Sequence, residues 1–425
     1  MLKLLKQITP WMVASLLVAT TAFGQESRPN AGGLNAKNEQ PAKPCAKPEC
    51  KPKSCPPPCP QPCPPTQLCP SQPSACCPPW PMPVLNAAYN YPARTQTRCP
   101  WDLFFDISFI YWQPTEDNIA LGKKWSGLNN ATDPVSTTSY TETLQNTGSS
   151  YKPGFKIGMG GFFEHDNWDL HLEYTWFHNQ ESASFSVPSV ANATQALTDY
   201  WPEQVSGGTN YYDSGSGKWK LQMDILDLDL GRWYYVGTKL TFHPTVGLRA
   251  AWIHQRYSAT FSADSPLPYA TVGNGGAGNS PFHYLTTTGI SKSNSWGLGA
   301  KAGLDTNWML GYGFRLYGCG EGDLLFTRYT TLSTNTKNSP NAPSTGTPTQ
   351  SVKSATNLNT VRAHLDLELG FGWGTYWDCN NWYTDLAIGY DFQVFFDQNM
   401  FGFDSQISEG DLATQGLNVK FSLTF

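Results

Sequence analysis

The sequence has 425 residues, a net charge of −5, 14% aromatic residues and only 14% charged residues. It contains no run or face of lysine and arginine, so the composition gives no support to a nucleic-acid partner. A chain that is rich in aromatic residues but poor in charge is expected to alternate apolar residues with polar ones, and its length would allow two or more domains.

Residues 1–24 have the three parts of a secretory signal peptide. Lys3 and Lys6 precede an apolar run from Trp11 to Ala19, and small residues, among them Gly24, prepare a cleavage site. A retained transmembrane helix is the alternative, but the run is too short for a ~30 Å hydrocarbon core, which needs about 20 residues. No later stretch has 18 consecutive apolar residues, so the sequence predicts export and excludes a helical membrane protein.

Residues 25–100 form a second segment, rich in proline and cysteine, in which we expect extended and disordered chain. Proline blocks the hydrogen bonding of helices and sheets, so this segment cannot build a core. Nine of the eleven cysteines lie here: Cys45, Cys50, Cys55, Cys59, Cys63, Cys69, Cys76, Cys77 and Cys99.

Three roles compete for these thiols, which meet an oxidising compartment after export. Metal binding would prefer flexible cysteine pairs, whereas prolines separate Cys55, Cys59 and Cys63. Local disulfides would cross-link a segment that has no folded core to stabilise. Nine is an odd number, so at least one thiol is left for another chain, and we favour cross-linking to other envelope proteins.

From residue 101 onward apolar and polar residues alternate with a period of two, as in strands with two different faces. Ten segments have this pattern: 103–111, 155–163, 168–176, 226–230, 240–252, 296–304, 310–316, 361–373, 386–394 and 417–425. The period breaks twice. A register shift is predicted between Ile225 and Leu226, and Arg232 falls on the apolar face unless a bulge at Gly231 turns Trp233 and Tyr235 outward.

The connections between these strands favour one architecture. Short links at 165–167, 237–239, 306–308 and 376–381 alternate with long ones at 114–152, 180–216, 259–292, 331–357 and 397–413. A soluble β-sandwich has no reason to alternate its loop lengths in this way. A transmembrane β-barrel does, because it has short periplasmic turns, long outer loops and an even strand count. We therefore predict an all-β fold, in which residues 101–425 form a transmembrane antiparallel barrel of about 10 strands, with 8 to 14 as the range.

The last strand ends on Phe425. An alternating strand closed by an aromatic residue is similar to the C-terminal signal of bacterial outer-membrane barrels, so the insertion machinery is an expected partner and outer-membrane lipid the expected surroundings. The same strand would close the sheet and leave no edge in lipid.

Four stretches carry a family resemblance: KPGFKIGMGGFFEHDNWDLHLEYTWFH, WKLQMDILDLDLGRWYYVGTKLTFHPTVGLRAAWIHQRY, SWGLGAKAGLDTNWMLGYGFRLYG and WYTDLAIGYDFQ. They resemble the Legionella-type pore-forming major outer membrane proteins, a family also represented in chlamydia-related bacteria. The resemblance covers about residues 101–425 and implies a pore without catalytic residues. The proline- and cysteine-rich tract departs from it and resembles the disulfide-linked envelopes of chlamydia-like bacteria. Because ten strands put both ends of the barrel on the periplasmic side, we expect this tract in the periplasm.

The strand pattern places charges of both signs on the inward face, where they would line a pore for small hydrophilic solutes or ions. The predicted pore-lining residues are Lys156, Glu164, Asp169, Glu173, Arg249, Lys301, Asp305, Arg315, Arg362, Asp366, Glu368, Asp385, Asp391 and Lys420. The same charges could instead pair and plug a narrow barrel, since side chains just fill an eight-stranded one.

Other functions have weaker support in the sequence. A hydrolase would need paired acids or a Ser/His pair, and His178, His254, Asp199 and Asp264 are better explained as solvated residues at outer strand ends and in loops. A non-conducting structural or adhesin barrel is the stronger alternative, because the outer loops are long. We expect no enzymatic activity, no cofactor and no metal.

Overall fold

The computed structural model describes residues 93–97, 102–117, 119–127, 140–163, 167–188, 195–199, 211–262, 284–340, 350–403 and 406–425. The signal peptide and the nine cysteines of the N-terminal tract lie outside these residues. Among the residues described, no helix is long and apolar enough to cross a membrane.

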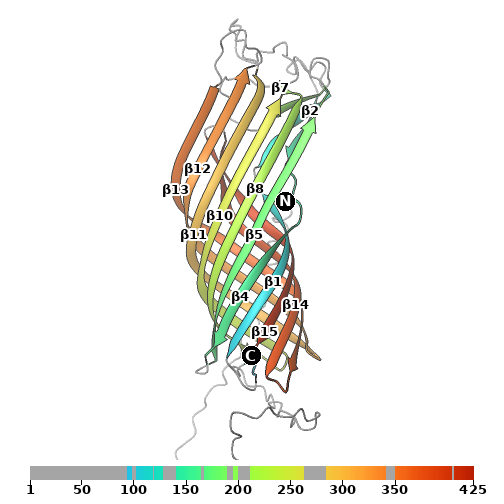
Figure 1. Cartoon of the computed structure of the whole chain (residues 1–425), viewed down its shortest axis with the longest axis vertical. Coiled ribbons are helices and arrows are strands. Elements are labelled where there is room, and N and C mark those ends of the chain that lie inside the picture. The colour runs from blue at the N-terminus through green and yellow to red at the C-terminus, as the bar shows by residue number, and fades with distance from the viewer. Residues whose placement is uncertain are drawn as a thin grey trace, which may run out of the picture. The chain divides into compact units, whose positions relative to one another are not determined.

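Ten antiparallel strands form a closed barrel, as the sequence predicts (Figure 1). They are β1 (Leu103–Glu116), β4 (Lys152–Phe162), β5 (Trp168–Ser186), β8 (Ser214–Arg232), β10 (Leu240–Ser262), β11 (Tyr284–Gly311), β12 (Phe314–Pro340), β13 (Gln350–Trp377), β14 (Trp382–Phe403) and β15 (Gln406–Thr424). A two-residue strand, β9 (Tyr234–Tyr235), pairs with β10 at the rim.

The barrel closes where its two ends meet. Strand β15 lies between β14 and β1, and Phe425 exchanges backbone hydrogen bonds of 3.1 and 3.3 Å with Leu103. The Phe425 ring stacks on Phe105 and packs against Trp382. The terminal aromatic residue therefore seals the seam, and the sheet has no open edge there.

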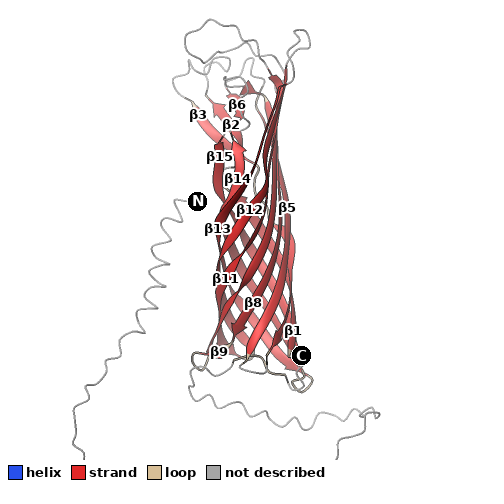
Figure 2. Ribbon diagram, turned by 90° about the vertical axis from the view of Figure 1, so that its left-hand side faces the viewer, coloured by secondary structure: helices blue, strands red, loops and turns tan. Residues whose placement is uncertain are grey.

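Five connections lie at the end of the barrel opposite to Leu103 and Phe425, and two of them contain the strands of a small sheet. Figure 2 shows β2 (Ala120–Ser126), β3 (Thr141–Asn146) and β6 (Gln195–Asp199) at that end, and β7 (Tyr211–Tyr212) completes the sheet. We call this sheet the cap. Its Leu121 is fully buried against Gly217 of β8, where a Cβ atom would overlap the leucine side chain.

The barrel strands extend beyond the predicted spans. The range 397–413, expected to be a long loop, is largely strand, because β14 continues to Phe403 and β15 begins at Gln406. The predicted short link at 306–308 is also wrong. These residues continue β11, and the chain turns at Gly311, Tyr312 and Gly313, which all have positive φ.

The interior has two different halves. In β8, Trp219, Leu221, Met223 and Ile225 point inward and are buried, and the inward positions that follow are Asp227 and Asp229. The predicted register shift at Ile225 is therefore wrong: the alternation is unbroken, and the inward face changes from apolar to acidic.

The half toward the cap contains one contiguous apolar cluster, which we call the apolar plug, beside buried polar side chains such as Gln255, Ser295 and Gln398. Its members come from the barrel wall and from the cap: Ile110, Trp112, Ile119, Leu121, Phe177, Val187, Leu197, Tyr212, Trp219, Leu221, Met223, Ile225, Ala251, Ile253, Tyr257, Ala259, Phe261, Leu325, Phe395, Phe401 and Leu412. The plug therefore lies between the cap and the polar half of the lumen near the short turns.

Candidate functional site: a charged cavity below the apolar plug

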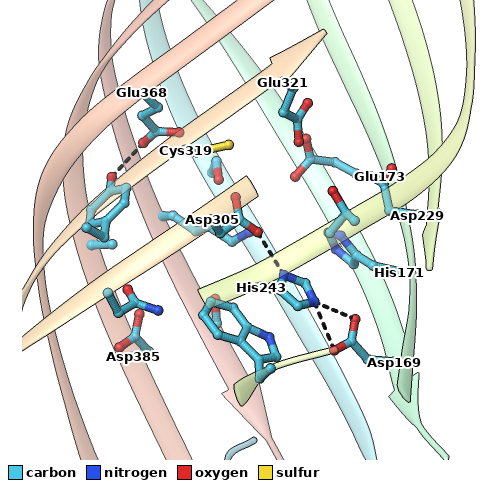
Figure 3. Close-up of a pocket in the computed structure, with 18 of the residues that line it drawn as sticks. Asp169, His171, Glu173, Asp229, His243, Asp305, Cys319, Glu321, Glu368 and Asp385 are labelled. Atoms are coloured by element: carbon cyan, nitrogen blue, oxygen red, sulfur yellow. Dashed lines mark hydrogen bonds and ion pairs between the residues drawn. The ribbon is translucent and has the colours of Figure 1, made fainter. Parts of the chain in front are cut away.

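The polar half of the barrel encloses a cavity of about 350 Å³. Its lining extends from Phe162, Trp233 and Thr424 near the short turns to Ile225 at the plug. Nine carboxylates line it, against five lysine and arginine side chains. The cavity is therefore acidic overall, and Figure 3 shows carboxylates from several strands pointing into it.

Arg249 on β10 is the centre of the deepest ion-pair network. Its Nε and Nη2 donate to the two carboxylate oxygens of Asp227, both at 2.6 Å, in the bidentate geometry that suits a guanidinium. Nη1 donates to Asp323 at 2.8 Å, and Nη2 donates to Glu321 at 3.1 Å. The Arg249 side chain is only 3% exposed, so removing it would leave buried carboxylates without their main partner.

Lys301 on β11 joins this network to the next acidic residue toward the short turns. Its Nζ donates to Asp229 at 2.8 Å and lies 2.8 Å from a Glu321 oxygen. Asp227 is also within reach, at 3.3 Å. The network thus links β8, β10, β11 and β12 across the lumen.

His243 lies between two carboxylates, as Figure 3 shows. Its Nδ1 is 2.8 Å from Asp305, and its Nε2 is 3.0 Å from both oxygens of Asp169. An imidazole ring that donates from both nitrogens would satisfy both carboxylates at once. Trp233 stacks on this ring with centroids 4.2 Å apart, so it points inward, and of the two predicted alternatives the one without a bulge holds, with Arg232 on the apolar face opposite Trp168. No bulge is present at Gly231.

A second set of pairs lies on β1, β4, β5, β14 and β15. His171 is 2.9 Å from Asp106, and Lys420 Nζ is 3.3 Å from the other oxygen of the same carboxylate. Lys156 lies between Asp391 at 3.5 Å and Glu173 at 3.9 Å. Each lysine on this wall is therefore already neutralised by carboxylates.

The β12–β14 wall completes the lining. Arg315 makes a bidentate pair with Asp385, and Arg315 Nη2 donates to it at 2.6 Å. Glu368 accepts from the Tyr317 hydroxyl at 2.5 Å and from Asn418 Nδ2 at 3.1 Å. Asp366 also lines the cavity and interacts with Asp391 and with Lys156.

Eleven of the fourteen predicted pore-lining residues meet at this cavity: Lys156, Asp169, Glu173, Arg249, Lys301, Asp305, Arg315, Asp366, Glu368, Asp385 and Lys420. Asp391 is buried behind Lys156 and does not line it. Arg362 is placed beside Tyr329 and Met400 in the cap half, where it also lies 3.5 Å from Glu409. Glu164 lies outside the described residues.

The list of predicted residues misses several members of the lining. Asp227, Asp229, His171 and His243 alternate with apolar residues in the sequence and could have been found by extending the same pattern. Glu321 was missed because glycines at 318, 320 and 322 interrupt the apolar row that marks the outward face of β12.

Two groups in the lining have metal-ligating atoms close together: Asp106, His171 and Glu173, and Asp305, Cys319 and Glu321. In the first, Lys420 and Lys156 already pair with the carboxylates. In the second, His243 holds Asp305 and Lys301 holds Glu321. These cations already neutralise the carboxylates that would bind a metal ion, so we assign no metal to either group.

The two histidines considered for hydrolysis do not converge. His178 on β5 and His254 on β10 face outward and are separated by Gln222 of β8 in the cross-strand row. His178 lies 3.5 Å from Asp224. Asp264 lies outside the described residues.

Comparison with known families gives one match, over residues 94–425, to the model described as Legionella pneumophila major outer membrane protein precursor. No curated protein matches the chain. Among solved structures, the outer membrane protease OmpT from Escherichia coli is 12% identical and has a TM-score of 0.32, covering 78% of this chain and all of OmpT. The Pseudomonas putida toluene transporter TodX is 10% identical with a TM-score of 0.29, over 76% of this chain and 89% of TodX. Likeness at this level says nothing about activity.

Proposed function

Because the chain belongs to the Legionella major outer membrane protein family, we propose that its outer-membrane barrel is a pore for small hydrophilic solutes or ions, closed by the apolar plug in the conformation described. The observation that carries the proposal is the charged cavity. A barrel that served only as an anchor would need no water-sized space lined by fourteen charged side chains. A solute pathway needs such a lining, because it replaces part of the hydration of an ion.

The plug supplies the gate in this proposal. Hydrophobic constrictions close channels by excluding water, and they open when the constriction widens or becomes polar. Trp219 and Met223 are suited to this role, because both point inward from β8 and are at most 1% exposed. Removing their side chains would leave a polar cavity on one side and a gap toward the cap on the other.

Planar-bilayer recording on the refolded protein tests the proposal. We expect rare or small conductance steps from the wild type and frequent, larger steps from the double variant Trp219→Ala, Met223→Ala. The matched control is Trp252→Ala, Leu228→Ala, which removes similar side chains from the lipid face of β10 and β8 and should conduct like the wild type. A folded plug variant that stays silent would contradict the pore.

A non-conducting structural barrel is the second candidate, and the plug itself favours it. The cluster is contiguous across the lumen, and the ion pairs below it connect most strands. Both features stabilise a barrel regardless of transport. Silent plug variants that keep normal folding would support this second function.

We propose no enzymatic activity, since His178 and His254 face outward on different strands and no Ser/His pair accompanies them in the described chain.

We further propose that residues 25–100 lie in the periplasm and that their cysteines cross-link the protein to other envelope proteins. The chain enters the barrel at Leu103 beside Phe425, at the short-turn end, which is periplasmic in barrels of this type. Non-reducing gels of whole envelopes should show high-mass species that dithiothreitol converts to one band. Deleting residues 41–98 should abolish these species and leave heat-modifiable folding intact, whereas a monomer on non-reducing gels of unblocked samples would contradict the cross-linking.

A further inference from the structure

Three cations lie side by side on the outward face of the barrel. Arg256 on β10 is directly opposite Lys220 on β8, and on its other side it is directly opposite Lys292 on β11. All three side chains are exposed. Figure 1 shows these three strands next to one another along the barrel wall. We call these three residues the cation row.

The cation row lies just beyond the lipid-facing belt. On β10 the exposed residues Val246, Leu248 and Trp252 form the apolar outward face, and Trp252 is opposite Trp296 of β11. Aromatic residues at this position mark the girdle at the membrane interface. Arg256 follows Trp252 by four residues toward the cap, which is about 10 Å along the membrane normal for a tilted strand. The row is therefore at the level of the outer-leaflet headgroups.

Nothing in the described part of the chain neutralises this row. None of the three side chains makes an ion pair or a side-chain hydrogen bond there. Asp224, the acid on the same face, accepts a hydrogen bond from Tyr174 at 2.7 Å and lies beside His178. The residues that flank the row, Gln180 on β5 and Ser333 on β12, carry no charge.

Such a row is unfavourable for the isolated barrel. Like charges directly opposite each other on neighbouring strands repel, and these strands are about 4.8 Å apart. Two more cations add to the same surface: Lys218 is opposite Ser258, and Arg328 is opposite Trp296. The arrangement becomes favourable when an anion with several oxygens lies across the strands, because guanidinium binds phosphate in a bidentate manner.

We propose that the cation row binds the phosphate groups of an anionic glycolipid of the outer leaflet. The ligand is a lipid, because the row begins where the apolar belt ends, so an acyl chain can lie along Leu248 and Trp252 while the phosphate reaches Arg256. A phosphate free in solution would gain nothing from the apolar part of this surface.

Titration of the full-length protein in detergent micelles with diphosphorylated lipid A, followed by native mass spectrometry, tests the assignment. The double variant Arg256→Gln, Lys292→Gln should weaken binding about tenfold or more, since each cation near a lipid headgroup contributes on the order of 1 kcal/mol. The matched control, Lys124→Gln with Lys239→Gln, removes two cations from β2 and from the turn before β10 and should bind like the wild type. Heat-modifiable mobility on gels shows that each variant is folded.

Two further probes separate a lipid from its parts. Lipid A with both phosphates removed should bind weakly to the wild type and equally weakly to the double variant. Inorganic phosphate at millimolar concentration should not displace diphosphorylated lipid A. Equal affinity of the wild type and the double variant for diphosphorylated lipid A would overturn the proposal, and so would displacement by inorganic phosphate alone.

Discussion

The stability of the charged interior of this barrel depends on single residues. Arg249 holds Asp227, Glu321 and Asp323 at distances of 2.6 to 3.1 Å, and Asp227 and Asp323 are buried. A buried carboxylate without its cation is costly, whereas an exposed cation has little effect on stability. The two arginines of β10 allow this difference to be measured on one strand.

Arg249→Met should lower the free energy of unfolding by about 3 to 5 kcal/mol, because it leaves the buried carboxylates of Asp227 and Asp323 without their shared partner. Arg256→Met, on the outward face of the same strand, should change it by less than about 0.5 kcal/mol. Urea unfolding in lipid vesicles, followed by tryptophan fluorescence, measures both. Equal losses would mean that the Arg249 network does not stabilise the barrel.

Residues on the lipid-facing side of the barrel must be apolar, and this requirement can be tested separately. Leu367 is exposed on the outward face of β13 near the middle of the apolar belt. Leu367→Arg should cost about 2 to 4 kcal/mol, and Asn359→Arg, on the same face beyond the belt, about 0 to 1 kcal/mol. The same unfolding assay compares them. If Asn359→Arg costs as much as Leu367→Arg, the belt has been placed at the wrong height.

At the scale of elements, much of the barrel could be predicted from the sequence. Strict alternation identified all ten strands, since one face meets lipid and the other meets the lumen. Strand ends were less predictable, because β11 and β12 continue beyond the membrane, where alternation no longer marks a face with lipid. The turn at Gly311–Gly313 was missed because Tyr312, 99% exposed, reads in sequence as one more apolar strand residue.

The plug could not be predicted from the pattern alone. Trp219 and Asp227 are an even number of residues apart on β8, so both point inward. Because we expected the lumen to be polar throughout, the inward apolar residues suggested a register shift. Only the positions of Phe177, Tyr257, Phe395 and the cap residues, which are far apart in sequence, show that these side chains have apolar partners. The charged cavity was easier to predict, because its residues alternate in the sequence with lipid-facing ones.

The closing strand β15 carries an element-scale prediction. Phe425 packs on Phe105 and Trp382 at the seam, and it is also the expected contact for the insertion machinery. Phe425→Ala should slow machinery-assisted insertion into proteoliposomes several-fold more than it slows spontaneous refolding into detergent, as read from heat-modifiable mobility. Equal slowing in both assays would indicate a packing role only.

At the scale of the whole molecule, the barrel has a lipid-facing belt, an acidic cavity near the short turns and an apolar plug toward the cap. We propose that current, once the plug is opened, passes through the acidic cavity. Carboxylates outnumber lysine and arginine in the lining by nine to five, so cations should be favoured over chloride.

The most direct measurement is the reversal potential of the plug variant Trp219→Ala, Met223→Ala in a potassium chloride gradient. We expect a preference for potassium that falls when Asp366→Asn and Glu368→Gln are added, since both residues line the cavity and glutamine can still accept from Tyr317 and Asn418. A reversal potential that these two substitutions leave unchanged would contradict the account, because the current would then bypass the cavity.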